Sequence, residues 1–301
     1  AAEAGLLGPI AVRALSSSAL QAVELAILNR MHGEWPGPLL VWQILEGGGF
    51  DTADRCLAER HFLEASLEFA RKTGKPEAEG AVYYSLGNHC ANIFDSRGAI
   101  HAFNRARRLR PAYAEQGYFL SEVGGALFSA GRFALSARIY AQAILLDPSP
   151  RLTLHHGDSL FFSGAFAEAA ARYDEAIDAG SDAIIAEAGI KLWVLEWLIQ
   201  RFGCSLKFDR AAVLVLNGDE RTNRALDGLD PIDPLANFNE GIRAAAAGDH
   251  VAAARCFLIC AFRQSGDEEA WQNALLCAAS TKDDTLFTSI LGGALALGGP
   301  N

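Results

Sequence analysis

The sequence predicts an all-α protein, an α-solenoid of stacked antiparallel helix pairs. Half of the residues are hydrophobic and 21% are charged, a balance typical of folded chains. Alanine is frequent, and β-branched and aromatic residues do not cluster as they do in strands, which favours helix. Small and aromatic residues also recur with a period of roughly 34 residues, and such self-similarity indicates a repeat architecture.

The clearest repeat has an aromatic residue and Leu-Gly on one predicted helix, then alanine, an aromatic residue and alanine on a second, and a closing proline. Its residues are Tyr83, Leu86, Gly87, Ala99, Phe103, Ala106 and Pro111. Two later units repeat this order with Gly124, Gly131, Phe133, Tyr140 and Ala143, and with Gly157, Gly164, Phe166, Ala169, Tyr173 and Ala176. A weaker unit contains Phe62, Ala65 and Phe69, and a last one Gly241, Gly248, Ala253, Phe257 and Cys260.

The aromatic residue of the second helix sets the period. Phe69, Phe103, Tyr140 and Tyr173 follow one another at intervals of 34, 37 and 33 residues. Glycine inside a helix costs about 1 kcal/mol relative to alanine, so its recurrence at one phase indicates close helix crossings. Because one helix pair cannot bury its apolar face alone, the pairs are expected to stack.

This order of residues resembles the tetratricopeptide repeat family. The unit from Tyr83 to Pro111 departs from the family pattern at two positions, Cys90 and Phe94, where the family usually has a tyrosine and a small residue. The resemblance implies a right-handed superhelix whose concave face is lined by the first helix of each pair. It also implies a protein-binding function rather than catalysis.

From the geometry of that family, we expect a set of aromatic and polar residues on the concave face, where they would bind a peptide or a partner protein. These residues are Tyr84, Asn88, Asn92, Tyr118, Ser121, Phe128, Arg151, Leu154, Asp158 and Phe161. Aromatic rings supply rigid contact area, and an asparagine amide can pair with a ligand backbone as donor and acceptor. The alternative is that several of these side chains pack against neighbouring helices.

The expected organisation has four parts. Residues 1–45 form N-terminal helices, with one at 17–31 and one at 39–45, and residues 46–181 form the tetratricopeptide repeats. Residues 182–234 form a divergent helical segment, with a long helix at 183–201 and shorter ones at 209–216 and 219–226. Residues 235–301 form a last repeat and a capping pair at 268–279 and 283–297.

Composition excludes several classes of function. The net charge of -10 and the pI near 5.2 disfavour nucleic acid and suggest a basic partner. No apolar stretch is long enough to predict a membrane span. The six dispersed cysteines are expected to be free thiols, which favours a cytoplasmic location. A periplasmic or secreted location stays open, because the sequence does not begin with methionine.

The leading hypothesis is therefore a protein-interaction module, with no cofactor and no metal. The alternative is an accessory or regulatory subunit of a larger enzyme or secretion complex. It would dock, or self-associate, through the apolar tail at 286–297 and the region of Trp193 and Trp197. An enzyme with its site in 183–234 ranks last, because that segment contains no histidine and its one cysteine is Cys204.

Three further clusters have simpler interpretations than a site. His155 and His156 are adjacent, so on a helix they point about 100° apart and do not easily share a metal. Cys256 and Cys260 fit as small buried residues. Finally, four arginines end a predicted second helix, where they favour the helix C-terminus. They are Arg105, Arg107, Arg108 and Arg110.

Overall fold

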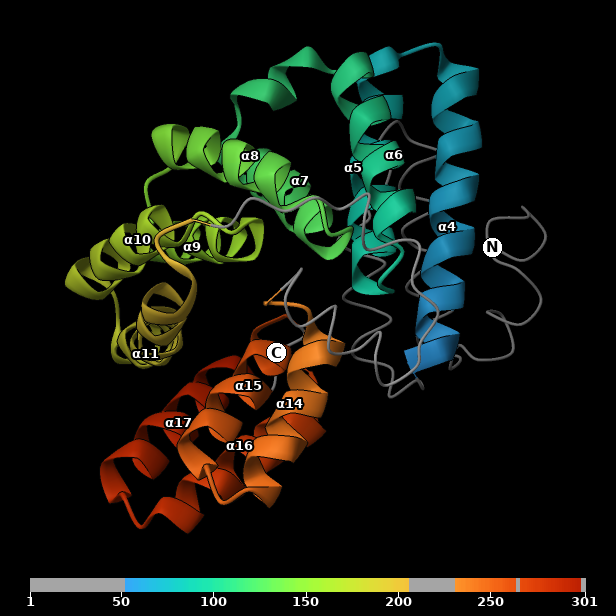
Figure 1. Ribbon diagram of the computed structural model, residues 1–301. Helices are drawn as coiled ribbons and strands as arrows, with labels where there is room; N and C mark the ends of the chain where they lie inside the picture. Colours follow the sequence, from blue (N-terminus) through green and yellow to red (C-terminus); the bar gives the residue numbers. More distant parts are fainter. Residues whose placement is uncertain (1–51, 206–230, 264–265, 299–301) are drawn as a thin grey trace, which may run out of the picture. The chain divides into compact units, whose positions relative to one another are not determined.

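The computed structural model describes residues 52–205, 231–263 and 266–298 (Figure 1). It divides into two compact units, residues 1–132 and residues 133–301, and each is described by itself below. Within the described residues the regular elements are helices and no strand occurs, which confirms the predicted all-α class. The helices expected at 17–31, 39–45, 209–216 and 219–226 lie outside the described residues.

Unit 1 consists of α4 (Thr52–Thr73), α5 (Pro76–Asn92), α6 (Ser96–Leu109), the 3₁₀ turn η1 (Pro111–Glu115) and α7 (Gly117–Ser129). Helices α5 and α6 form a closely packed antiparallel pair (Figure 1). Between α6 and α7, η1 places Tyr113 in the core, where the side chain is 3% exposed. This longer connection accounts for the 37-residue interval in the sequence period.

Unit 2 begins with α8 (Phe133–Leu146), α9 (Pro150–Ser163), α10 (Phe166–Ala179) and α11 (Asp182–Phe202). It ends with α14 (Pro234–Ala246), α15 (His250–Arg263), α16 (Glu268–Thr281) and α17 (Asp284–Gly298). Helix α11 agrees with the helix expected at 183–201, and α16 and α17 agree with the expected last pair. Helix α17 packs against α11, although residues 203–283 separate the two helices along the chain.

Capping residues explain where several helices begin. Ser149 accepts a hydrogen bond from the Leu152 backbone N–H, and Asp233 accepts one from that of Ala236. Proline follows each of these caps at the first helical position, where its fixed φ fits and its missing N–H has no intrahelical partner to lose. These signals set the start of α9 and α14, each the first helix of a pair.

The recurring glycines lie where the paired helices cross, as the sequence predicts. A Cβ atom on Gly157 would lie 2.6 Å from the Tyr173 ring, and one on Gly241 would lie 2.9 Å from the Phe257 ring. Gly87 faces Phe103 in the same way. In each pair the aromatic residue follows the glycine by 16 positions (87 and 103, 157 and 173, 241 and 257). The three pairs α5–α6, α9–α10 and α14–α15 therefore share one packing arrangement, in which a glycine of the first helix faces an aromatic ring of the second.

A second position recurs at the turn between the paired helices. Seven residues after each first-helix glycine, Gly131, Gly164 and Gly248 have φ angles of 71°, 83° and 84°. Glycine adopts this left-handed conformation readily because it lacks a Cβ atom. In the α5–α6 pair the same position is Phe94, with φ of 61°. One hairpin thus places a bulky side chain where these three have glycine.

No helix in the described part of the chain is long and apolar enough to cross a bilayer.

Candidate functional site

The expected site residues of unit 1 lie on α5 and α7, the first helices of their pairs. Tyr84, Asn88 and Asn92 follow one another at four-residue spacing, so they share one face of α5. Tyr84 and Asn88 are half-buried, and Asn92 is exposed. We call this surface, with the α7 residues described below, the α5–α7 face.

An aromatic cluster forms one end of this face. The Tyr84 ring lies 5.4 Å from that of Tyr113, 5.8 Å from that of Tyr118 and 5.9 Å from that of Phe119, measured between centroids. Tyr113 stacks on Phe119 at 4.8 Å. Tyr118 is 48% exposed, so one ring of the cluster reaches solvent. The cluster holds that ring rigidly, which lowers the entropy lost on binding.

Asn88 supplies an acceptor with no partner. Its Oδ1 atom is buried and accepts no hydrogen bond in the described part of the structure. An unsatisfied buried polar atom costs about 1–3 kcal/mol, so this position carries a local cost in the folded chain. Burial also raises the pKa of the Tyr84 hydroxyl group one turn away, so this hydroxyl stays protonated and neutral at neutral pH.

A cavity of about 200 Å³ lies at the other end of the face, between the C-terminal part of α5 and helix α7. Its lining residues are Ala91, Asn92, Phe94, Ser96, Glu122, Gly125, Ala126 and Ser129. A cavity of roughly 150 Å³ accommodates a benzene molecule, so this one has room for a single large side chain. Glu122 is its one charged lining residue within the described part of the chain.

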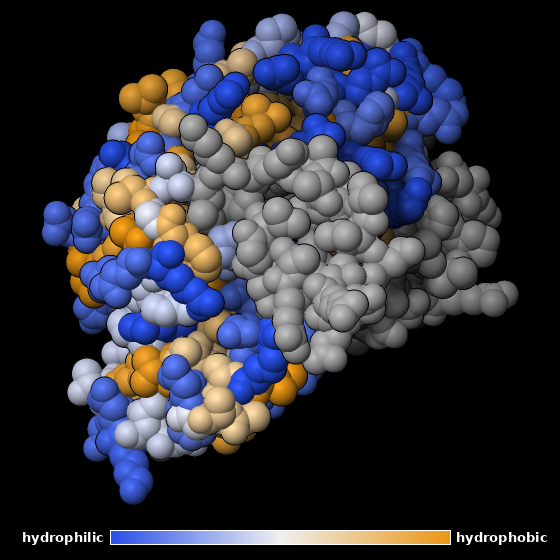
Figure 2. All heavy atoms as spheres, viewed as in Figure 1, coloured by the Kyte–Doolittle hydropathy of each residue, from blue (hydrophilic) through white to orange (hydrophobic). Residues whose placement is uncertain are grey.

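Phe94 stands at the edge of this cavity and is 90% exposed. Hydrophobic residues interrupt the hydrophilic surface in many places, so exposure alone does not distinguish Phe94 (Figure 2). Its backbone does, because a left-handed conformation costs a bulky residue roughly 1–2 kcal/mol. The turn is fixed by hydrogen bonds from the Phe94 N–H to the Ala91 carbonyl and from the Asp95 N–H to the Cys90 carbonyl. Such strain concentrates at functional sites.

The remaining α7 residues complete the face. Ser121 and Phe128 are half-buried, and Gly125 lies between them in the cavity wall. In the sequence, Phe94 stands out only as a departure from the repeat pattern. Its exposure and its place at the cavity edge have no signature in that pattern.

Phe161 of unit 2 is in a different environment. Its side chain is 1% exposed, and its ring lies 4.9 Å from that of Phe162 and 5.9 Å from that of Phe166. Leu154, which the sequence also placed on the concave face, is fully buried. The alternative of packing against neighbouring helices therefore describes these two residues. Neither reaches the surface, so neither is available to a ligand in this structure.

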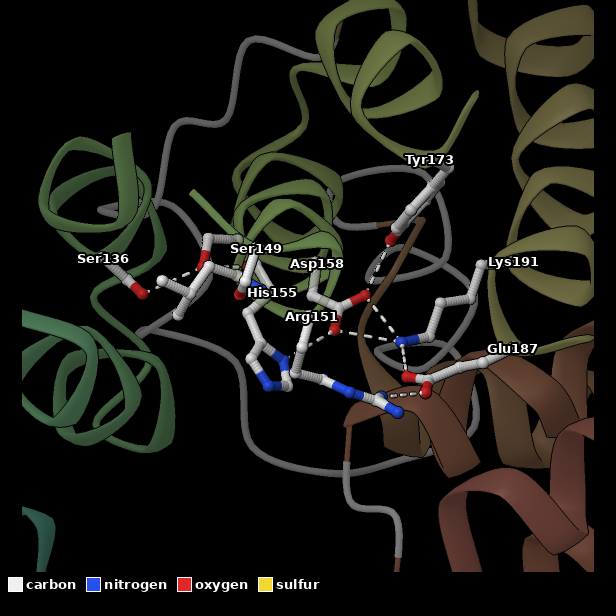
Figure 3. Close-up of polar contacts among 10 residues, drawn as sticks. Ser136, Ser149, Arg151, His155, Asp158, Tyr173, Glu187 and Lys191 are labelled. Atoms are coloured by element: carbon white, nitrogen blue, oxygen red, sulfur yellow. Dashed lines mark hydrogen bonds and ion pairs between the residues drawn. The ribbon is translucent and has the colours of Figure 1, made fainter. Parts of the chain in front are cut away.

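Arg151 and Asp158 belong to a charged cluster that joins α9, α10 and α11 (Figure 3). The Lys191 ammonium lies 2.8 Å from Asp158 Oδ1 and 2.6 Å from Glu187 Oε1. Arg151 Nη1 lies 2.5 Å from Glu187 Oε2. The Tyr173 hydroxyl donates to Asp158 at 2.9 Å. We call these five residues the ionic cluster.

The interior of the ionic cluster is closed to solvent, whereas the Arg151 side chain at its edge is 42% exposed. The side chains of Glu187 and Lys191 are 1% and 3% exposed. Burial would raise the pKa of Asp158, but Lys191 and His155 outweigh it and lower that pKa to about 2. Burial likewise lowers the pKa of Lys191, but Asp158 and Glu187 raise it by more. Asp158 and Lys191 are therefore both charged at neutral pH and paired with each other.

These contacts hold α9, α10 and α11 together, and they occupy the groups that a reaction would use. The charges of two carboxylates and two cations cancel. Each carboxylate already accepts a hydrogen bond from Lys191, and Glu187 also accepts one from Arg151. Removing one partner would leave a buried charge uncompensated. Glu187 and Lys191 were not among the residues expected from the sequence. Their signal was a charged pair at four-residue spacing within an otherwise apolar helix.

Cys260 and the arginine run at the end of α6 both pack against other parts of the protein. The Cys260 thiol donates to the Pro234 carbonyl at 3.0 Å, and burial raises its pKa to about 12, so it is not a thiolate at neutral pH. In the arginine run, Arg105 lies 6.0 Å from the Tyr83 ring and Arg110 lies 5.0 Å from the Tyr113 ring. Both arginines thus stack on aromatic rings near the end of α6.

No family model matches the chain, and no curated protein matches it. Among solved structures, the chain is similar to the crystal structure of MamA protein, with 14% identity and a TM-score of 0.30, over 74% of this chain and 92% of that one. It is also similar to PilF of Pseudomonas aeruginosa, with 13% identity and a TM-score of 0.32, over 74% and 90%. These TM-scores are too low to support inference about the site.

Proposed function

We propose that this chain is a protein-interaction module that binds an extended peptide on its α5–α7 face. Phe94 carries the proposal: a bulky aromatic residue is held exposed, at a conformational cost, beside a cavity that fits one side chain. A purely structural turn would use glycine, as the turns at Gly131, Gly164 and Gly248 do. Rigid aromatic anchors beside a cavity are typical of binding hot spots.

The chemistry of the face suggests what the peptide presents. One apolar side chain would enter the cavity between Phe94 and Gly125. Backbone N–H groups would donate to the side-chain oxygen of Asn92, which is exposed at the end of α5. Glu122 would favour a basic or hydrogen-bond-donating group nearby. Tyr118 would cover the opposite end. The expected concave-face residues Arg151, Asp158 and Phe161 are left out because they are already engaged in unit 2.

The first prediction concerns Phe94→Gly. This variant should be more stable than the wild type by about 1 kcal/mol, because glycine relieves the left-handed strain. It should nevertheless bind peptides at least about tenfold more weakly, since the anchor is lost. The measurement selects peptides from a displayed random library with the wild-type protein. It then compares their dissociation constants by fluorescence anisotropy and the stabilities by urea unfolding.

The matched control is Lys282→Gly, which relieves the other described non-glycine residue with positive φ, at 58°, in unit 2. It should gain stability and keep full affinity. Asn92→Ala and Tyr118→Ala should each weaken the same peptides. Peptides that bind Phe94→Gly as tightly as the wild type would show that this face is not the binding site.

The alternative function, an accessory or regulatory subunit of a larger enzyme or secretion complex that docks through apolar surfaces, is a second proposal. One observation favours it. The two regions expected to dock, around Trp193 and around Leu286, line one groove in unit 2.

A further inference from the structure

Unit 2 contains a surface groove of about 860 Å³ along the seam between α11 and α17, which we call the α11–α17 groove. From α11 it is lined by Ile185, Ala186, Gly189, Ile190 and Trp193, and from the start of α15 by Val251. The opposite wall consists of Asp283, Asp284, Thr285, Leu286, Thr288, Ser289 and Gly292. The groove therefore follows both helices lengthwise. From Ile185 to Trp193 it extends about 12 Å along α11.

Small residues form part of the groove lining. A Cβ atom on Gly189 would meet no atom within 4 Å, and one on Gly292 would meet only the Ala186 methyl group at 3.7 Å. Gly293 differs, because its Cβ would lie 2.9 Å from Ile190. Helix α17 thus touches α11 at Gly293, whereas Gly189 leaves backbone exposed beside open space. Bare backbone of this kind allows a second backbone to approach closely.

Apolar side chains flank these small residues. Ile185 is 40% exposed and Val251 is 36% exposed, so each keeps apolar surface in contact with water. Trp193 is held in place by Arg255, whose guanidinium carbon lies 4.3 Å from the ring centroid. The walls are therefore positioned before any partner arrives, which favours binding.

Charge in the groove has one sign. Asp283 and Asp284 are the charged residues among those that line it, and both are exposed. The Asp283 carboxylate caps α17 by accepting hydrogen bonds from the Thr285 and Leu286 backbone N–H groups. Asp284 is therefore the carboxylate better placed to meet a partner. An occupant with a positive charge at this end would complement the groove.

We propose that the α11–α17 groove binds an amphipathic α-helix of a partner protein. Small and apolar residues of that helix face Gly189 and Trp193, and a lysine or arginine lies near Asp284. The elongated shape favours a helix over a compact ligand, because the two walls of the groove offer contacts to successive turns of a bound helix. This inference rests on the proposal that the chain binds proteins, but it uses no residue of the α5–α7 face, so either can fail alone.

The probes are two synthetic helical peptides with the same leucine and alanine face, one flanked by lysines and the other by glutamates. Binding is measured by fluorescence anisotropy of the labelled peptides. The wild type should bind the lysine peptide at least about tenfold more tightly than the glutamate peptide. Gly189→Leu should weaken the lysine peptide at least about tenfold by filling the groove. Gly189→Ala, a matched control, should retain most of the affinity.

Asp284→Lys provides a second, independent variant at an exposed position. It should shift the preference toward the glutamate peptide, and circular dichroism should show an unchanged fold. The lysine peptide binding Gly189→Leu as well as wild type would overturn the proposal, because attraction to the net negative charge would then suffice. Binding of dodecylamine, with no binding of either peptide, would assign the groove to a small amphiphile instead. A wild-type dimer that Gly189→Leu dissociates would assign it to a second copy.

Discussion

At the residue scale, Phe94 and Asn88 each carry a local energetic cost on the face proposed to bind a peptide. Phe94 occupies a left-handed turn position that is glycine in three other described hairpins. Asn88 keeps a buried acceptor without a partner among the described residues. Either feature alone would be a small defect, but both lie on the α5–α7 face with the cavity. A ligand side chain that packed on Phe94 in the cavity would offset part of this cost.

Asp158 leads to a prediction about acid stability. Its folded pKa is about 2, below the ordinary value of 3.8. Because the folded pKa is depressed, the stabilisation is fully present above pH 3.8 and is lost as the pH falls toward 2. The gain is on the order of 2 kcal/mol. Urea unfolding of the wild type and of Asp158→Asn, measured from pH 7 to pH 2, should give free energies that converge across this window.

His155 also faces Asp158, at 3.7 Å between Nδ1 and Oδ2. A variant of His155 is therefore measured beside Asp158→Asn. The variant His155→Gln should lose less stability than Asp158→Asn, because Lys191 and Tyr173 still hold the carboxylate. A constant difference between the wild type and Asp158→Asn from pH 5 to pH 2 would show that this carboxyl group has an ordinary pKa.

At the scale of elements, two helical glycines should respond oppositely to the same substitution. Gly157→Ala should destabilise unit 2 by about 1–2 kcal/mol, because the new methyl group meets the Tyr173 ring, which is buried and hydrogen-bonded to Asp158. Gly189→Ala should stabilise by up to about 1 kcal/mol, since nothing opposes the gain in helix propensity. Thermal and urea unfolding of both variants measure the difference. Equal effects would mean that the helix crossing at Gly157 tolerates a Cβ atom.

The same pair of glycines shows how far sequence reasoning reaches. Gly157 lies in a repeating phase, so its place at a helix crossing could be predicted from the period alone. Gly189 lies in α11, outside that phase, and nothing in the sequence connected it with Asp284 or Gly292. Contacts between α11 and α17 join segments far apart in the chain. A period records contacts within repeats, but it does not record contacts between distant helices.

For the expected site residues, the sequence predicted which helix face they share better than it predicted which side chains surround them. The spacing of Tyr84, Asn88 and Asn92 gave their common face on α5. It did not give the aromatic cluster around Tyr84, because Tyr113 belongs to η1, a turn that the repeat pattern does not contain. Arg151 and Asp158 were expected on an open surface, but their environment is set by Glu187 and Lys191 on a divergent helix.

At the scale of the whole molecule, the charged residues of the two proposed binding surfaces differ in exposure from the inner residues of the ionic cluster. The net charge of -10 is compatible with basic partners at both proposed surfaces, where Glu122 and Asp284 are exposed acidic residues. The ionic cluster, by contrast, pairs its charges internally, and of its five residues Arg151 alone is substantially exposed. Salt should therefore weaken peptide binding at either surface while changing the folding of unit 2 little, because screening acts mainly on exposed charges.

The ionic cluster also tests whether the two units fold independently. Lys191→Met would leave Asp158 and Glu187 with a lost ammonium partner inside the core, at a cost of about 3–5 kcal/mol. Hydrogen exchange should then lose protection in α9, α10 and α11, while α5 and α6 of unit 1 keep theirs. Lys72→Met is the control, because its pair with Glu68 is exposed and is therefore expected to contribute little to stability. Equal loss of protection in both units would show that they unfold as one cooperative body, since Asp158, Glu187 and Phe262, which Lys191 contacts, all lie in unit 2.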